Sequence, residues 1–490
     1  MLFNSLQFLI FFPIVTLVYF LIPQKVRWLW LLAASYYFYM CWNPQYALLI
    51  ATSTVVTFCS GLFIDRGKTV FWRKIIVGIS FTINLAILFY FKYFYFTLDN
   101  INAVRHMLHM STLVPKFDVI LPVGISFYTF QALSYTVDVY RKEIPPEKNI
   151  LKYALFVSFF PQLVAGPIER SKNLLTQVNE THSFNYERAR SGLLMMLWGF
   201  FMKLVIADRA AILVNSVYNN VQNYSGALLA AATVGFAVQI YCDFASYSTI
   251  ACGAARVLGF NLMNNFEQPY FSKTIAEFWR NWHISLSSWF KDYLYIPLGG
   301  NRCGNFRKYF NIMIVFLVSG LWHGASWHYV VWGAVHGIYQ VIGGLTKNMR
   351  RLTCELVGID RTRPHYIWFQ RLFTFVLVCF SWIFFRAENM SQSIEIIRKI
   401  FTDFRPWSLY DGGLVSMGLD LANTSVLLAA IMLLFGVSFC EYKKCPVLGA
   451  VESWHLIARW TLYLLLLFAV LIFGVYGPGF ANSQFIYFQF

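Results

Sequence analysis

Residues 278–336 read FWRNWHISLSSWFKDYLYIPLGGNRCGNFRKYFNIMIVFLVSGLWHGASWHYVVWGAVH. This stretch contains four of the nine histidines of the chain, His283, His323, His328 and His336, among aromatic and small residues. Imidazole is the side chain whose unperturbed pKa lies nearest neutrality, so a histidine held within a membrane is a candidate for proton transfer. The stretch therefore predicts that the chain is built around one or more buried histidines.

The composition of the surrounding chain is that of a membrane protein. Of 490 residues, 58% are hydrophobic and only 13% are charged, whereas a soluble globular protein carries about 25% charged residues. A segment that crosses the hydrocarbon core must satisfy its own backbone hydrogen bonds, and an α-helix of about 20 residues does so. The sequence therefore predicts an all-α polytopic membrane protein.

Apolar runs separated by charged or Pro/Gly breaks predict about eleven to thirteen membrane-embedded helices. Some of these runs are too short or too polar for a simple span, and the segment 275–298 is the clearest of them because it mixes charged residues with aromatic ones. We expect a re-entrant or broken element there, covered by protein or lying against a cavity. No hydrophilic stretch is long enough for a separate soluble domain, so residues 1–484 are predicted to form a single transmembrane domain.

The basic residues and the cysteines both have a structural interpretation. Lys and Arg number 39 against 23 Asp and Glu, and the resulting charge of +16 lies in short loops between apolar runs. Such charges orient spans and contact anionic membrane lipids, so we expect no nucleic-acid partner. The nine cysteines are scattered without a C-x-x-C pair, which indicates buried small residues rather than a disulfide framework or a zinc site.

Two histidines are the candidates for chemistry. His323 lies between Gly320 and Gly324, which allow close backbone approach and an imidazole open to a cavity, and His283 lies in the polar segment 275–298. For each, the alternative is a buried histidine that is simply hydrogen-bonded. A metal site is not expected, because His323 and His328 are five residues apart and residues 309–344 contain no Asp or Glu.

Serine chemistry is not supported either. The candidates Ser126 and Ser326 both miss the G-x-S-x-G pattern of a nucleophile elbow. The remaining possibility is a histidine that acts as a general base on a hydroxyl group.

Several long motifs together resemble the membrane-bound O-acyltransferase family. They are FWRNWHISLSSWFKDYLYIPLGG, SGLWHGASWHYVVWG, FNSLQFLIFFPIV, LPVGISFYTFQALSYTVDVYR and FFPQLVAGPIER, and their order extends the resemblance over nearly the whole chain. The sequence is most similar to the bacterial branch of the family that contains the alginate O-acetyltransferase membrane subunits.

The resemblance implies that His323 is the catalytic histidine and His283 the second signature histidine, near each other across a thin septum between a cytoplasmic and an extracytoplasmic cavity. Trp322, Trp279 and Trp282 are candidates for lining the central channel, and ordinary packing is the alternative for each. It implies acetyl-CoA or another acyl thioester as acyl donor, with no tightly bound cofactor. The acceptor would be an exported cell-surface polysaccharide, reached directly or by relay through an extracytoplasmic acetyltransferase partner. The expected location is the bacterial inner membrane.

The last six residues, 485–490, read FIYFQF. They match an F-x-Y-x-x-F pattern, and its fixed positions are Phe485, Tyr487 and Phe490. The resemblance implies that the tyrosine of this pattern accepts the acyl group before it passes to a secreted transferase. A phenolate leaves more readily than an alkoxide because the pKa of the tyrosine phenol is near 10, so Tyr487 is suited to carry an acyl group. The alternative is an aromatic anchor at the membrane interface.

Two other functions remain open at this point. Within the same family, D-alanyl transfer toward teichoic acid would use an acyl carrier protein as donor. Outside it, a transporter would move an acyl group or lipid without making a bond, and such a protein would keep partial flux without His323.

Overall fold

The computed structural model describes residues 1–115, 121–477 and 485–486, and within them the chain is helical, with one isolated antiparallel bridge between Phe266 and Trp282. The fold falls into two compact units, one formed by residues 1–196 and 248–263 and the other by 197–247 and 264–490. The predicted all-α class is confirmed. The prediction of a single transmembrane domain over 1–484 stays a prediction.

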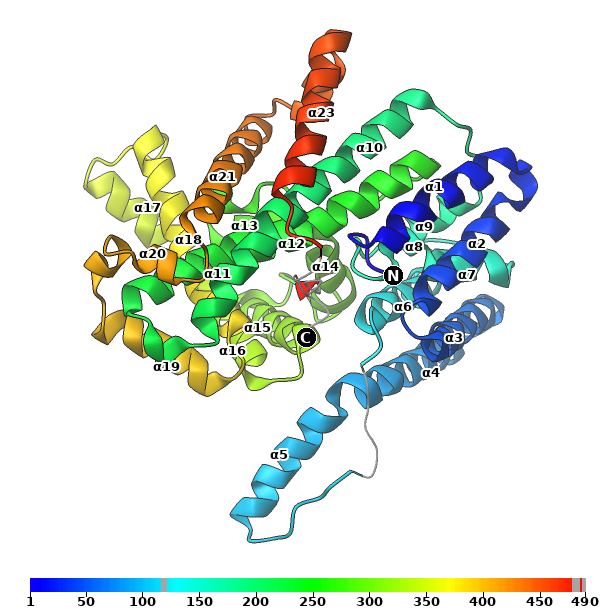
Figure 1. Ribbon diagram of the computed structural model, residues 1–490. Coiled ribbons are helices and arrows are strands. Elements are labelled where there is room, and N and C mark those ends of the chain that lie inside the picture. The colour runs from blue at the N-terminus through cyan, green and yellow to red at the C-terminus, as the bar shows by residue number, and fades with distance from the viewer. Residues whose placement is uncertain (116–120, 478–484, 487–490) are drawn as a thin grey trace. The chain divides into compact units, whose positions relative to one another are not determined.

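The first unit begins at the N-terminus and contains a pair of long helices that lie side by side, α3 and α4 (Figure 1). Its elements are α1 (Leu6–Leu21), α2 (Gln24–Met40), η1 (Pro44–Tyr46), α3 (Ala47–Arg66), α4 (Val70–Leu88), the π-helical η2 (Phe89–Tyr93), α5 (Phe94–Met107), α6 (Ile125–Tyr140), α7 (Ile150–Ser158), α8 (Phe160–Leu163), α9 (Ser171–Val178) and most of α10 (Tyr186–Phe200).

The second unit contains all four histidines of the stretch 278–336. Its elements are the π-helical η3 (Phe201–Ala207), α11 (Asp208–Tyr218), η4 (Val221–Asn223), most of α12 (Gly226–Leu258), η5 (Pro269–Phe271), α13 (Ile275–Asn281), α14 (Ile284–Phe290), the π-helical η6 (Lys291–Tyr295), α15 (Gly304–His323), α16 (Trp327–Leu345), α17 (Lys347–Leu356), α18 (Pro364–Arg386), α19 (Met390–Thr402), η7 (Pro406–Leu409), α20 (Gly413–Ser416), α21 (Leu421–Tyr442), α22 (Val447–Glu452) and α23 (Leu456–Phe473).

Six helical segments among the described residues are long and apolar enough to cross a membrane. They are Pro44–Arg66, Val70–Met107, Gly226–Leu258, Pro364–Arg386, Leu421–Tyr442 and Leu456–Phe473. A span of about 20 residues matches the hydrocarbon core. The chain is therefore a multi-pass membrane protein, and the larger number of eleven to thirteen membrane-embedded elements stays a prediction.

The polar segment 275–298 is broken into three short helices, α13, α14 and η6, as its composition predicts. The start of α13 is fixed by side chains at its first turn. Thr274 Oγ1 accepts the amide of Glu277 at 3.1 Å, and the Glu277 carboxylate accepts the amide of Lys273 at 2.8 Å. Because these bonds satisfy amides that a helix start leaves unpaired, they place α13 in a defined register ahead of His283.

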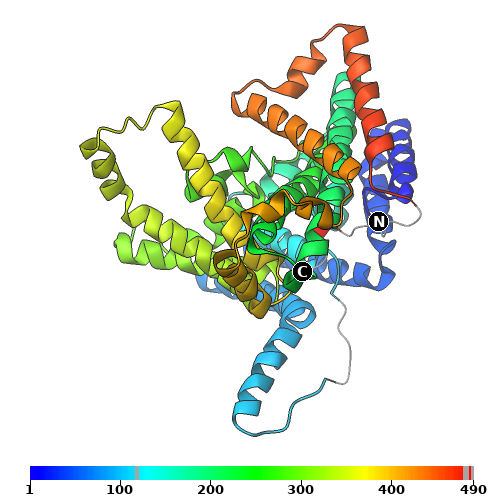
Figure 2. The same ribbon diagram turned by 60° about the vertical axis from the view of Figure 1, so that its left-hand side comes forward.

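The hairpin of α15 and α16 is packed through glycines, and it appears in yellow-green in Figures 1 and 2. A Cβ atom on Gly320 would lie 2.3 Å from the carbonyl oxygen of Tyr329, and one on Gly333 would lie 2.2 Å from that of Phe316. Only residues without a Cβ let the two backbones approach so closely. The glycines therefore set the position of the end of α15, where His323 lies.

Candidate functional site

His283 lies at the junction of α13 and α14 in a left-handed backbone conformation, with φ 46° and ψ 54°. A non-glycine residue in this region costs about 1–3 kcal/mol and persists only where its surroundings hold it. Here residues 265–267 pair with residues 281–284, because the Glu267 amide donates to Asn281 O at 3.0 Å and the Ile284 amide donates to Asn265 O at 2.9 Å. Such strain, held by a local pairing, is typical of functional sites.

The side chain of Asn265 fixes the tautomer of His283. Asn265 Oδ1 accepts hydrogen bonds from the Ser285 amide at 3.2 Å and from Ser285 Oγ at 3.0 Å, and it lies 3.1 Å from His283 Nδ1. A backbone amide only donates, so the Asn265 atom facing it is the oxygen, and Nδ1 of His283 must donate to that oxygen. In the neutral ring, Nε2 of His283 therefore carries a lone pair.

Burial keeps the His283 ring neutral. The residue is fully buried, and this burial lowers the pKa of the imidazole to about 3. The phenyl ring of Phe244 covers one side, with ring centres 4.6 Å apart in an edge-on arrangement. At neutral pH His283 thus accepts a hydrogen bond at Nε2 rather than presenting a positive charge.

His323 is the last residue of α15 and lies beside His283, with the two ring centres 6.4 Å apart. Its ring is only 3% exposed and is flanked edge-on by the rings of Trp322, Trp332 and Phe385 at 5.0, 4.9 and 5.3 Å. The glycines near His323 allow α15 to pack closely against α16, so the imidazole is enclosed by aromatic rings and is not open to a cavity as expected from the sequence. The structure nevertheless brings together the two histidines that the sequence singled out.

The other residues singled out in the stretch 278–336 occupy distinct places. Trp322 lies against both rings, with centres 6.0 Å from His283 and 5.0 Å from His323. Trp282 stacks on Phe278 at 5.4 Å within the aromatic core. Their role in lining a channel, and that of Trp279, stays a prediction.

His336 and His328 are held by hydrogen bonds, as packing residues would be. The Trp279 indole donates to Nδ1 of His336 at 3.1 Å. Nε2 of His336 donates to Ser381 Oγ at 2.8 Å, because that hydroxyl already donates to the Val378 carbonyl. His328 Nδ1 donates to the Phe384 carbonyl at 2.9 Å. These hydrogen bonds join the two rings to Trp279, Ser381 and Phe384, and none of them is made to His283 or His323.

The described part of the C-terminal segment is anchored next to the histidines. The amide of Ile486 donates to Asp243 Oδ2 at 2.7 Å, and the ring of Phe485 packs against Tyr247 and Phe244 at 4.8 and 5.7 Å. Phe244 in turn contacts His283. The proposed relay residue Tyr487 and the last residue Phe490 lie outside the described residues.

Asp243 also belongs to a buried ion-pair cluster centred on Lys203. Lys203 Nζ lies 2.5 Å from Asp243 Oδ1 and 2.9 Å from Asp208 Oδ1, and all three side chains are at most 8% exposed. Lys203 belongs to η3 and Asp243 to α12, so this pair joins two helical segments, as is usual for charged residues at membrane depth. One carboxylate thus connects this cluster to the backbone of Ile486.

Sequence reasoning singled out His283 and His323 but missed Asn265, which bonds His283. The residue is 18 positions before His283, and its neighbours NNFEQPY carry no recognised motif. Within the described residues, no group of three or more His, Cys, Asp or Glu side chains is placed to hold a metal ion. The arrangement offers two adjacent imidazoles, one of them neutral with a fixed tautomer, for proton transfer and hydrogen bonding.

Fold and site together define a class: multi-pass helical membrane proteins with a buried histidine pair. The sequence model of "MBOAT, membrane-bound O-acyltransferase family" matches residues 18–385. The chain belongs to this family, and it is a membrane acyltransferase.

Individual relatives extend this match over the whole chain. A probable alginate O-acetylase of Pseudomonas putida is 36% identical over 508 residues, which cover 100% of both chains. A peptidoglycan O-acetyltransferase of Helicobacter pylori is 32% identical over 81% of this chain and 79% of its own. A teichoic acid D-alanyltransferase of Streptococcus thermophilus is 27% identical and covers only 45% of this chain and 56% of its own.

Proposed function

We propose that this protein transfers an acetyl group from a thioester to hydroxyls of an exported cell-surface polysaccharide, of the alginate type or another exopolysaccharide or peptidoglycan. The observation that carries the proposal is the 6.4 Å separation of the His283 and His323 rings in a member of an acyltransferase family. The names of the two relatives aligned over most of their length, an alginate and a peptidoglycan O-acetylase, support acetate as the acyl group.

His323 is assigned as the general base. Its ring takes the proton of the attacking hydroxyl as the hydroxyl oxygen forms a bond to the thioester carbonyl carbon. The carbon–sulfur bond then breaks, and the proton passes from the imidazolium to the departing thiolate, so that one ester and one thiol leave the site. Such positioned proton transfer contributes about 10²- to 10⁴-fold to a rate, and the aromatic surroundings of His323 limit hydrolysis by water.

His283 is assigned an orienting role. Because Nδ1 donates to Asn265, its Nε2 presents a lone pair that can accept the hydrogen of an acceptor hydroxyl. A neutral acceptor holds the hydroxyl but does not stabilise the developing oxyanion, which requires a donor. Of the two roles that suit the second histidine, substrate orientation therefore fits this geometry better than charge stabilisation.

The donor, partners and location follow from the same proposal. We propose acetyl-CoA or another acyl thioester as a cytoplasmic donor that binds without being a resident cofactor. An extracytoplasmic acetyltransferase partner would complete transfer to the polysaccharide. The bacterial inner membrane is the compartment in which one protein can reach both a cytoplasmic thioester and an exported polymer. Eleven to thirteen membrane-embedded helices, some of them re-entrant or broken around a central channel, would provide that path.

Tyr487 is proposed as an acyl carrier between donor and partner. The support is the anchoring of the two residues that precede it, because Ile486 is bonded to Asp243 and Phe485 packs on Phe244, which contacts His283. In the relay, the tyrosine hydroxyl would attack the thioester carbonyl carbon, the carbon–sulfur bond would break, and the phenol proton would pass to the departing thiolate, which leaves as free thiol. A second hydroxyl would then attack the resulting phenyl ester and release the phenol.

D-alanyl transfer toward teichoic acid is the second candidate within the family. It is favoured only by the shorter match to a teichoic acid D-alanyltransferase. The ester formed distinguishes the two functions, since alkaline hydrolysis of the modified polymer releases acetate in one case and D-alanine in the other.

The test is the ester content of the surface polymer in cells that carry single variants. His323→Gln should abolish acetylation while the protein level in membranes is unchanged. His328→Gln is the matched control, because His328 lies in the same stretch and is buried, but its Nδ1 bonds a backbone carbonyl. Wild-type ester content in His323→Gln would refute the assignment, and partial flux of unmodified substrate would support a transporter instead.

A further inference from the structure

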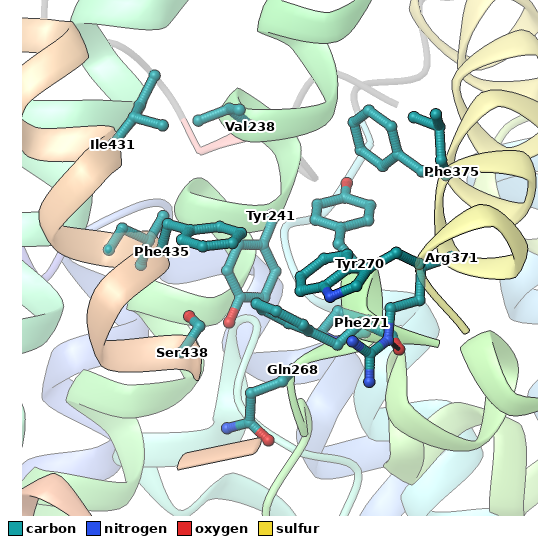
Figure 3. Close-up of a pocket in the computed structure, with 14 residues that line it drawn as sticks. Val238, Tyr241, Gln268, Tyr270, Phe271, Arg371, Phe375, Ile431, Phe435 and Ser438 are labelled. Atoms are coloured by element: carbon teal, nitrogen blue, oxygen red, sulfur yellow. Dashed lines mark hydrogen bonds between the residues drawn. The ribbon is translucent and has the colours of Figure 1, made fainter. Parts of the chain in front are cut away.

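A cavity of about 320 Å³ lies within the second unit, between α12, α18 and α21 (Figure 3). Its walls are hydrocarbon and aromatic side chains, including Val238 and Tyr241 of α12, Phe375 of α18, and Ile431 and Phe435 of α21. This volume is within the range of small-molecule sites. None of the proposed catalytic residues lines it, so the cavity is separate from the histidine pair.

The cavity is almost entirely apolar, and the few polar side chains of its lining lie toward one end. Figure 3 shows Ile431, Val238 and Phe375 toward one end, and Ser438 and Gln268 toward the other, where the Arg371 guanidinium also lies. Ile431 and Ser438 are seven residues apart on α21, which corresponds to about 10.5 Å along a helix axis. An apolar tail several carbons long and a polar group therefore match opposite ends of the same cavity.

Arg371 is a buried cation in an aromatic cage. The residue is 6% exposed, its Nε donates to the Phe271 carbonyl at 3.1 Å, and its Cζ lies 4.7 Å from the ring centre of Trp368 and 4.5 Å from that of Tyr442. None of the ion pairs among the described residues includes it. A buried guanidinium without a carboxylate partner favours an external anion, and its planar fork fits phosphate.

The side walls of the cavity face the bilayer. Leu372 and Phe435 line it and are 62% and 53% exposed, and they belong to α18 and α21, which are both long and apolar enough to span. Exposed apolar side chains on a span lie against lipid. The medium next to the cavity is therefore hydrocarbon, which supplies acyl chains.

The polar end lies at the level expected for lipid headgroups. Trp368 and Tyr442, which cage Arg371, are of the two residue types enriched at the membrane interface. Tyr442 is the last residue of α21 and is followed by Lys443 and Lys444. Glu441, the acid in this region, accepts a hydrogen bond from Gln268 Nε2 at 2.6 Å. Basic residues next to a span attract lipid phosphates.

We propose that this cavity holds one acyl chain of a membrane glycerophospholipid, with the lipid phosphate bound by Arg371. The lipid would be a bound structural ligand close to the junction of α13 and α14, where His283 lies. Tyr241 and Tyr270 line the cavity, and their rings lie 6.3 and 6.0 Å from that of Trp282, the residue immediately before His283. A lipid bound in the cavity would therefore pack against Tyr241 and Tyr270, which contact the residue next to His283.

The experiment is native mass spectrometry of the purified full chain after exchange into detergent with one defined lipid at a time. The lipids are phosphatidylglycerol, phosphatidylethanolamine and a diacylglycerol with the same acyl chains but no phosphate. We expect one phospholipid to be retained per chain, and the diacylglycerol to be retained at least about tenfold less, since a hydrogen bond to a charged group accounts for that factor.

Variants separate the two ends of the site. Arg371→Gln should lower phospholipid retention to the diacylglycerol level, and Ile431→Trp should lower it by filling the apolar end while Arg371 remains. Leu428→Trp is the matched control, because Leu428 is an exposed residue of the same helix that does not line the cavity. If Arg371→Gln fails to fold, the comparison of Ile431→Trp with Leu428→Trp decides. Equal retention in those two proteins, or equal retention of diacylglycerol and phospholipid by the wild type, would overturn the proposal.

Discussion

Oδ1 of Asn265 lies 3.1 Å from Nδ1 of His283 while also accepting the amide of Ser285. One amide oxygen thus fixes both the backbone turn at His283 and the tautomer of its ring. The bond orients Nε2 of His283 as an acceptor, and burial keeps the ring neutral by lowering its pKa to about 3. If His283 orients a substrate hydroxyl, its function depends on Asn265.

The pH dependence of transfer tests this relationship. In the wild type, His283 stays neutral from pH 5 to 8, so we expect no loss of rate from its titration in that range. Asn265→Asp places a carboxylate beside Nδ1, which raises the pKa of His283 because it stabilises the imidazolium. The rate of Asn265→Asp should therefore fall as the pH decreases and recover as the pH increases.

The measurement is the initial acetylation rate in membrane vesicles between pH 5 and 8.5. Asn265→Ala, which removes the acceptor without adding charge, serves as the comparison and should be slow at every pH. If Asn265→Asp is slowed by one constant factor across the range, the asparagine is only structural.

The glycines between α15 and α16 give a second prediction. Gly333→Ala introduces a Cβ 2.2 Å from the Phe316 carbonyl, and such overpacking costs about 1–3 kcal/mol. Its thermal unfolding midpoint in detergent should fall, and acetylation should fall with it because α15 carries His323. Gly343→Ala on the same helix has open space around its Cβ and should unfold no earlier than the wild type. Equal midpoints for the two variants would contradict the close packing.

The buried ion-pair cluster around Lys203 gives a third prediction. Asp243→Asn keeps an acceptor for the Ile486 amide but removes one of two carboxylates that contact the Lys203 ammonium. A lost hydrogen bond to a charged group should lower the free energy of unfolding by about 1.5–3 kcal/mol. Asp403→Asn, in an exposed pair with Arg405, should have no measurable effect. Denaturation of the two purified variants followed by tryptophan fluorescence makes the comparison.

The proposed relay gives a fourth prediction. Tyr487→Phe removes only the hydroxyl that would carry the acyl group, so it should abolish acetylation of the polymer while leaving Phe485 and Ile486 in place. Mass spectrometry of the C-terminal peptide should find a 42 Da acetyl adduct on Tyr487, roughly the mass of the acetyl group less the hydrogen it replaces, in the wild type but not in His323→Gln. Full activity of Tyr487→Phe would contradict the relay and support the alternative, in which residue 487 is an aromatic anchor at the membrane interface.

The fold class and the proximity of His283 and His323 to each other were expected from the sequence, because short stretches of it carry the apolar composition and the family motifs on which these expectations rest. Apolar composition predicts spanning helices, and the mixture of charged and aromatic residues in 275–298 predicts a broken element, which the structure contains as α13, α14 and η6. The glycines around His323 were correctly assigned to close approach. What they approach, the backbone of α16, could not be derived because it depends on packing between two helices.

Contacts between distant parts of the sequence were not predictable. Asn265 and His283 are 18 residues apart, Trp279 and His336 are 57, and Asp243 and Ile486 are 243. No periodicity or motif records such pairings, since they arise only when the helices pack. The cavity beside Arg371 was not predictable for the same reason, because its walls come from α12, α18, α21 and residues 268–271, whose separation is set by tertiary structure.

The central claim is that His323 removes the proton of the attacking hydroxyl, and thiol release measures it directly. Membrane vesicles that contain the protein together with its extracytoplasmic partner, supplied with acetyl-CoA and a soluble polysaccharide acceptor, should release free thiol at a rate that depends on the acceptor. We predict that His323→Gln lowers this acceptor-dependent rate by about 10²- to 10⁴-fold, while His328→Gln retains it. An unchanged rate in His323→Gln, with the protein folded, would contradict the account.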